Sequence, residues 1–132
     1  MGKLSFTSIQ RSVFETITRH PLLLKTFYFT GGTALSAVYL HHRESEDLDF
    51  FSEIDFDDEQ ILDIVNNIAS SLNITARFTK HYRARIFELI KKNKVLIKID
   101  FVYHPHKRLE VGARVKGFAV DSLRDIATNK LL

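Results

Sequence analysis

The sequence predicts an α+β fold, in which a mixed, mainly antiparallel sheet is flanked by helices. Residues 5–19 and 57–72 carry apolar side chains at the three-and-four spacing of amphipathic helices. Residues 74–103 contain three short apolar segments separated by polar residues, a pattern typical of antiparallel strands. A meander of strands with helices packed beside it follows from these patterns.

The elements follow one another in a simple order. The helix over residues 5–19 ends at His20-Pro21, because the residue before a proline disfavours helical backbone. A short buried strand over 27–30 precedes a helix over 33–40, which has Thr33 near its N-cap. Further strands and helices are expected at these positions: a strand at 47–51, a helix opened by 57–59, strands at 74–79, 84–90, 95–103 and 118–120, and a helix at 123–132.

The composition favours one domain, residues 1–132, with a real hydrophobic core. Hydrophobic residues make up 45% of the 132 residues, and 11 of them are Phe. Cysteine is absent, and neither a signal peptide nor a run long enough to span a membrane is visible. We therefore expect a cytoplasmic protein without a membrane partner. Because the last helix is still apolar where the sequence stops, the domain is expected to be truncated at its C-terminal end.

Charge is distributed unevenly along the chain. Residues 44–63 contain ten acidic and no basic residues, whereas residues 74–132 contain fourteen Lys and Arg against five Asp and Glu. A basic half can attract a triphosphate or a nucleic acid, but charge alone favours the interpretation of a solvated surface. The tract over residues 80–94, with Tyr82 and Phe87, could guide RNA or form an ordinary sheet face with core aromatics.

Three groups of residues indicate nucleotide chemistry. Gly31-Gly32-Thr33 lies between a strand and a helix, where glycine allows close approach of a phosphate and Thr33 adds a hydroxyl. Asp47 and Asp49 alternate with apolar residues, so they share one face of a strand. Asp100 lies within the most apolar strand, where a carboxylate needs a partner or a cation. Three carboxylates can hold two Mg²⁺ ions, for which Mn²⁺ can substitute, and so catalyse transfer from an NTP.

Three basic or polar residues could assist these groups. Arg43 and Ser45 precede the carboxylates in a loop that would lie beside the triphosphate, although Arg43 could equally pair with a neighbouring glutamate. Lys98 points to the same face as Asp100, where it would contact phosphate or neutralise the carboxylate.

These motifs resemble the AbiEii/AbiGii toxin family, a branch of the DNA polymerase beta-like nucleotidyltransferase superfamily. The resemblance extends from Phe29 to Lys130 and is carried by four segments in the same order: Gly31-Gly32-Thr33-Ala34-Leu35, residues 43–51, residues 98–102, and residues 121–130. The wider superfamily commonly has a Gly-Ser pair at this turn, whereas this sequence has the pair Gly31-Gly32. The family's downstream Arg and Lys-Asp motif lies beyond Leu132.

The resemblance implies the minimal nucleotidyltransferase fold and a magnesium-dependent transfer of an NMP from an NTP to a hydroxyl acceptor. It further implies a toxin of a type IV toxin-antitoxin or abortive-infection system, with tRNA as a candidate acceptor and a cognate antitoxin as a partner. Asp47 and Asp49 match the family's metal carboxylates, and Gly31, Gly32 and Thr33 match its nucleotide-binding turn. Lys130 matches a lysine that is expected to contact the triphosphate.

Two other classes of function remain open from the sequence. A truncated relative could bind an NTP without turnover, or a basic domain could bind RNA without any NTP site. These alternatives are distinguished by whether NTP binding, transfer and RNA affinity depend on the carboxylates or on the basic residues.

Overall fold

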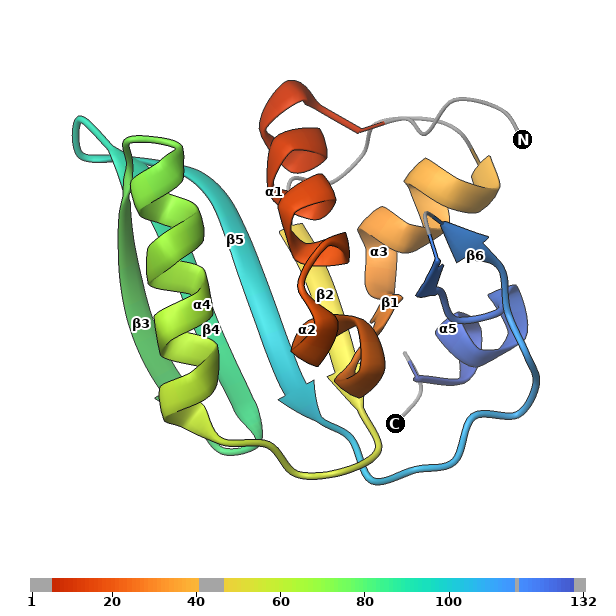
Figure 1. Cartoon of the computed structure of the whole chain (residues 1–132). Coiled ribbons are helices and arrows are strands. Elements are labelled where there is room, and N and C mark those ends of the chain that lie inside the picture. The colour runs from red at the N-terminus through yellow and green to blue at the C-terminus, as the bar shows by residue number, and fades with distance from the viewer. Residues whose placement is uncertain (1–5, 41–46, 116, 130–132) are drawn as a thin grey trace.

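The computed structural model describes residues 6–40, 47–115 and 117–129 and shows a five-stranded sheet with helices packed against it (Figure 1). The helices are α1 (Ser8–Thr18), α2 (Pro21–Thr26), α3 (Gly31–Ala34), the π-helix η1 (Leu35–Leu40), α4 (Asp58–Ser71) and α5 (Leu123–Asn129). The strands are β1 (Tyr28–Thr30), β2 (Asp47–Ser52), β3 (Thr75–His81), β4 (Ala84–Lys91), β5 (Lys94–Tyr103), β6 (Arg114–Val115) and β7 (Phe118–Ala119). The α+β class is confirmed.

The sheet has the strand order β1-β2-β5-β4-β3. β2 and β5 run parallel at its centre, and all other neighbouring pairs are antiparallel, so the sheet is mixed and mainly antiparallel as predicted. The expected hairpin turn between β4 and β5 is present, with positive φ angles of 52° at Lys92 and 61° at Asn93. Such left-handed backbone at two adjacent turn residues is typical of tight hairpins.

One face of the sheet forms the core. In Figure 1, α1 and α4 lie in front of the sheet. The side chains of Phe14, Phe29, Phe50 and Phe101 are buried in one hydrophobic core. Phe50 and Phe101 stack at 5.5 Å between ring centroids, and Phe14 contacts Phe29 at 5.0 Å. These large aromatic contacts fix how the helices sit on β1, β2 and β5.

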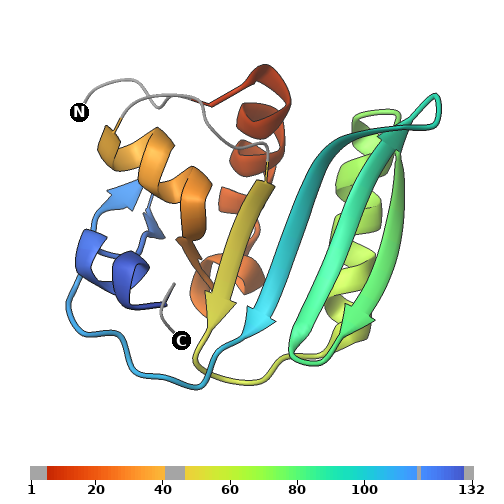
Figure 2. The same cartoon turned by 180° about the vertical axis from the view of Figure 1, so that it is seen from behind.

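The opposite face is more open (Figure 2). Seen from behind, β2, β5, β4 and β3 lie in front of α1 and α4, and the described part of the chain places no helix over them. η1 and α5 lie to one side, near β1 and β2. Residues of β2 and β5 that do not face the aromatic core therefore point toward this open side.

The predicted elements differ from the structure at three places. Residues 21–26 form the short helix α2, and Pro21 is its first residue. At this position the backbone N–H that proline lacks would have no hydrogen-bond partner within the helix. The helix expected over 33–40 starts earlier, at Gly31, and continues as a π-helix. The two-residue strand β6 was not expected, because so short a segment has no periodicity.

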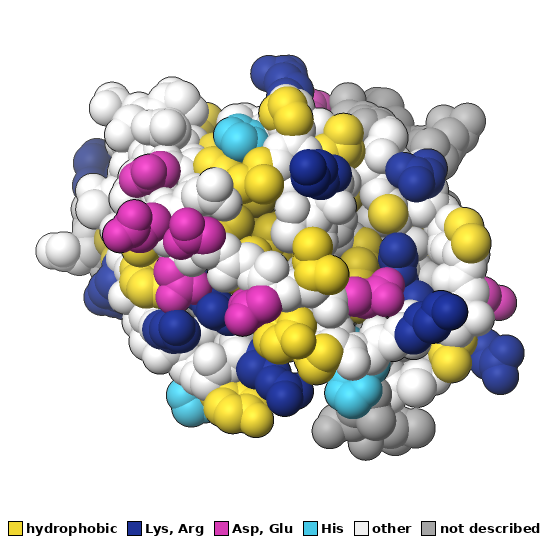
Figure 3. All heavy atoms as spheres, turned by 60° about the horizontal axis from the view of Figure 1, so that its bottom comes forward, with side chains coloured by type: hydrophobic (Ala, Val, Ile, Leu, Met, Phe, Trp, Pro, Cys, Tyr) yellow, Lys and Arg dark blue, Asp and Glu magenta, His cyan; other side chains and the backbone are white. Residues whose placement is uncertain are grey.

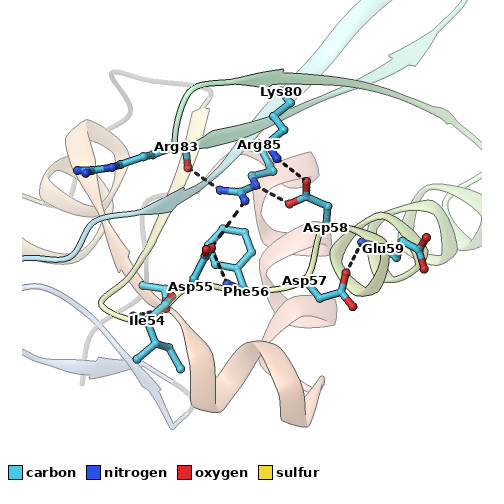
Figure 4. Close-up of polar contacts among 10 residues, drawn as sticks. Ile54, Asp55, Phe56, Asp57, Asp58, Glu59, Lys80, Arg83 and Arg85 are labelled. Atoms are coloured by element: carbon cyan, nitrogen blue, oxygen red, sulfur yellow. Dashed lines mark hydrogen bonds and ion pairs between the residues drawn. The ribbon is translucent and has the colours of Figure 1, made fainter.

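The acidic and basic halves of the sequence meet between α4 and the β3-β4 hairpin (Figure 4). Arg85 is 7% exposed, donates to Asp58 at 2.6 Å and lies over the ring of Phe56 at 4.6 Å. Lys80 donates to the other oxygen of Asp58 at 2.9 Å, and Phe87 is fully buried. Lys80, Arg85 and Phe87 of this tract are therefore structural, whereas Tyr82 is 79% exposed, so the interpretation of core aromatics holds for Phe87 and not for Tyr82.

Acidic side chains gather on one part of the surface. Figure 3 shows several Asp and Glu side chains gathered on one part of the end of the molecule that carries the loops after β2 and β5, with Lys and Arg side chains beside them. Exposed acidic residues of this region include Asp55, Asp57, Glu59 and Asp63. Among the described residues, no helix combines the length and apolar character needed to cross a lipid bilayer.

Candidate active site

The central feature of the open face is a pair of aspartates on adjacent strands. Asp49 of β2 and Asp100 of β5 are direct partners in the parallel register. Asp47 lies two residues before Asp49, and β2 alternates between half-buried and buried positions, so both carboxylates share one face as predicted. The three carboxylates predicted from separate parts of the sequence are thus neighbours in the sheet.

The glycine turn lies directly beside Asp49. Thr30, the last residue of β1, is the partner of Asp49 across the antiparallel pair, and Gly31 follows with φ +82°. A Cβ atom built on Gly31 would overlap the carboxylate of Asp49, whereas one built on Gly32 would meet no atom within 4 Å. Gly31 is therefore required both by its backbone conformation and by the close approach of Asp49.

The carboxylates repel one another in a partly dry environment. Burial, then the charges of Asp100 and Asp47, raises the pKa of Asp49 to about 7. Burial also raises the pKa of Asp100, against the opposing effect of the Lys98 ammonium. The Lys98 Nζ lies 3.9 Å from Asp47 Oδ2 and 3.7 Å from Asp100 Oδ2. One lysine thus faces a cluster of three acids.

A pocket of about 300 Å³ opens beside these groups. Its lining combines the carboxylates and the glycine turn with apolar and amide side chains: Thr30, Gly31, Asp49, Phe51, Asp100, Val102, Ile126 and Asn129. A cavity with charged groups at one end and apolar walls at the other suits a ligand with a charged and an apolar part.

A buried aspartate that the sequence did not reveal as important fixes one wall of this pocket. Asp121 is fully buried, and its Oδ2 accepts hydrogen bonds from Thr30 Oγ1 at 2.8 Å and Asn129 Nδ2 at 3.2 Å. Its backbone N–H donates to Phe29 O at 2.8 Å, and Tyr39 Oη donates to its carbonyl at 2.6 Å. Burial raises the pKa of Asp121 to about 6. These bonds attach α5 to the glycine turn.

A second aspartate anchors the start of α5. Asp125 is 3% exposed and accepts hydrogen bonds from the backbone N–H groups of Leu109 at 2.7 Å and Glu110 at 3.2 Å. Ser122 Oγ accepts from the Asp125 N–H at 3.0 Å and donates to its side chain, which forms a reciprocal cap. The Ser122-x-x-Asp125 spacing is a signal for this cap in the sequence, whereas nothing in the sequence signals the burial of Asp121.

The predicted site residues have different outcomes. The structure brings together Asp47, Asp49, Asp100, Gly31 and Gly32. Thr33 lies in α3 and is 1% exposed, outside the lining of the pocket. Arg43, Ser45 and Lys130 lie outside the described residues, so their predicted roles stay predictions.

The donor set suits a hard divalent cation, because Mg²⁺ binds carboxylate oxygens. Asp100 Oδ1 is buried without a hydrogen-bond partner in the described structure, which leaves an oxygen for such a cation. Among the described residues, however, no three His, Cys, Asp or Glu side chains already form a metal-binding group. Asp49 and Asp100 fit the ion, and a three-carboxylate site would need the side chains to rearrange.

The fold resembles that of two solved structures. JHP933 from Helicobacter pylori aligns with 96% of this chain at a TM-score of 0.61 and 18% identity, and the Megavirus polyadenylate synthase aligns with 95% at 0.53 and 11%. The chain spans 58% of the first protein and 29% of the second. Comparison with proteins of curated function gives no significant match.

The fold places the glycine turn beside the aspartates of β2 and β5. Residues 15–132 match the family described as nucleotidyl transferase AbiEii toxin, Type IV TA system. The chain belongs to this family, which confirms the resemblance inferred from the motifs.

Gly31→Ala tests the contact between the turn and Asp49. A side chain at φ +82° is strained, and its Cβ would displace the Asp49 carboxylate. We expect the free energy of unfolding to fall by about 1–3 kcal/mol, measured by urea denaturation. Gly32→Ala is the control and should change stability by less than about 0.5 kcal/mol, because its Cβ meets open space. Equal losses in both variants would contradict the proposed close approach.

Asp49→Asn tests whether burial and the neighbouring carboxylates raise the pKa of Asp49. A folded-state pKa near 7 lies above the ordinary value of 3.8 for an aspartate, so the contribution of Asp49 to stability is full below about pH 4 and is lost as pH rises through 7. In metal-free buffer, we expect the wild type to lose on the order of 2 kcal/mol more than Asp49→Asn between pH 4 and pH 8. Denaturation at both pH values measures this difference.

The control for this experiment is Asp63→Asn, which removes an exposed carboxylate on α4. It should keep the pH dependence of the wild type. If Asp49→Asn also keeps it, the carboxylate of Asp49 is not under the repulsion described above.

Proposed function

We propose that the chain transfers an NMP from an NTP to a hydroxyl group of an acceptor, with RNA, including tRNA, as the acceptor class. The observation that carries the proposal is the register of β2 and β5, which places Asp49 beside Asp100 and next to the Gly31 turn. Charged oxygens beside a glycine turn suit a triphosphate accompanied by a cation.

Asp49 and Asp100 would hold Mg²⁺, with Asp47 as a further ligand after rearrangement of its side chain. When bound, the ion would supply positive charge to the triphosphate and to the attacking oxygen. The pairing of these carboxylates in a half-buried site, where they repel each other, supports this assignment because a cation relieves that repulsion.

The residues of the chain would position the two substrates. The open space at Gly32 allows a phosphate to approach the backbone, and the apolar wall formed by Phe51, Val102 and Ile126 suits the base or sugar. The acceptor oxygen attacks the α-phosphorus, the bond from that phosphorus to the bridging oxygen breaks, and pyrophosphate leaves. The proton of the acceptor hydroxyl passes to a carboxylate, for which Asp100 is the proposed group.

We further propose a role as the toxin of a type IV toxin-antitoxin system with a cognate antitoxin. The support is the family to which the chain belongs, whose description names this role. The solved structures with the same fold are longer than this chain, so the proposal concerns the activity of the whole protein.

The test is incubation with labelled NTPs, Mg²⁺ and total RNA, followed by separation of labelled products. We expect a labelled RNA whose formation falls by at least about 100-fold in Asp47→Asn and Asp49→Asn, because the groups that hold the cation are lost. Asp63→Asn should label RNA at the rate of the wild type, and circular dichroism should show that all variants are folded.

Two results would contradict the proposal in different ways. A folded chain that neither labels RNA nor binds an NTP with Mg²⁺ has no nucleotide site. Magnesium-dependent NTP binding without transfer would instead support the alternative of a non-catalytic binding module.

A further inference from the structure

Lys98 lies at the centre of a row of alternating charges on the open face of the sheet. In the strand register, Asp47 of β2 is the partner of Lys98 on β5, which is the partner of Glu88 on β4, and Glu88 is the partner of Arg77 on β3. Cross-strand partners point to the same side of a sheet. The row therefore crosses four strands with the signs minus, plus, minus and plus.

In the described structure, the ammonium of Lys98 lies toward the carboxylates of Asp47 and Asp100. It lies 3.9 Å from Asp47 Oδ2 and 3.7 Å from Asp100 Oδ2, so it lies between carboxylates from two strands. No three acidic or histidine side chains of the described residues are grouped for a metal. Lys98 thus lies between two of the carboxylates that the proposed function assigns to a cation.

Lys98 also has an anionic neighbour on its other side. Arg77 binds Glu88 through Nε at 3.0 Å and Nη2 at 2.7 Å, and both bonds go to Oε1. Both printed bonds of Arg77 therefore leave Oε2, the second oxygen of Glu88, outside this pair among the described residues. The side chain of Lys98 is 38% exposed, and its four-carbon chain is flexible. It can therefore change its conformation without disturbing the core.

We infer that Lys98 is a displaceable counter-ion of the active site. In the metal-free protein it compensates Asp47 and Asp100, and when a divalent cation binds these carboxylates, repulsion moves the ammonium toward Glu88. This inference rests on the proposed function, because it assumes that the carboxylates bind a cation. Lys98 is a positioning residue in this role, and it sets how tightly the site holds its metal.

This role differs from that of an ordinary surface ion pair. An exposed pair between Lys98 and Asp47 would contribute little, and its removal would leave metal binding unchanged. A competing counter-ion instead lowers the affinity for the metal, so its removal raises that affinity. The direction of the change distinguishes the two roles.

The test is titration of the metal-free chain with Mn²⁺, with free Mn²⁺ measured by electron paramagnetic resonance. We expect Lys98→Met to bind Mn²⁺ about tenfold more tightly, because one positive charge about 4 Å from the site is removed. Lys98→Arg should bind like the wild type. Glu88→Gln should bind several-fold more weakly, because the displaced ammonium loses its second position.

The matched control is Lys94→Met, which removes an exposed lysine at the start of β5 and should leave Mn²⁺ affinity unchanged. Unchanged or weaker binding by Lys98→Met, with Mn²⁺ still bound by the wild type and lost in Asp49→Asn, would overturn the role of Lys98 alone. A wild type that does not bind Mn²⁺ would overturn both this role and the proposed metal site.

Discussion

The parallel register of β2 and β5 is the constraint on which both the core and the site depend. It places Phe50 beside Phe101 on the helix-covered face and Asp49 beside Asp100 on the open face. The two sets alternate along the same strands, so a shift of one residue in β2 relative to the sheet would turn its carboxylates into the aromatic core. The stacking of Phe50 and Phe101 at 5.5 Å therefore stabilises the arrangement that brings the two acids together.

The carboxylates of the site repel one another, and the stability of the rest of the fold compensates for this repulsion. Burial keeps Asp49 and Asp100 partly dry, and Lys98 contributes a positive charge beside Asp47 and Asp100. A different aspartate, Asp121, is fully buried, and its Oδ2 accepts hydrogen bonds from Thr30 and Asn129 that attach α5 to the sheet. Its Oδ1, like Oδ1 of Asp100, is buried without a hydrogen-bond partner among the described residues.

Local features of the fold and site could be predicted from the sequence. Alternation in β2 shows that Asp47 and Asp49 share a face, and the position of Gly31-Gly32 between apolar segments indicates a strand-to-helix turn. The motif order was sufficient to identify the family. These signals lie within segments of a few residues, where the period of a strand and the freedom of glycine are decisive.

Most long-range features could not be predicted. The three carboxylates were expected at one site, but the direct pairing of Asp49 with Asp100 depends on which strands are neighbours, and the sequence alone does not give that order. The ion pairs of Arg85 with the start of α4, and the row from Asp47 to Arg77, likewise arise only when distant strands align. Burial of Asp121 depends on the position of α5. The short helix α2 was missed because six residues contain too little periodicity.

The most direct test of the site is a crystal structure of the chain with Mn²⁺ and a non-hydrolysable NTP analogue. The site proposed above predicts an anomalous manganese peak in contact with carboxylate oxygens of Asp49 and Asp100, with the triphosphate against Gly31 and Gly32. A nucleotide bound elsewhere, or bound at the turn while no manganese contacts the two aspartates, would contradict it.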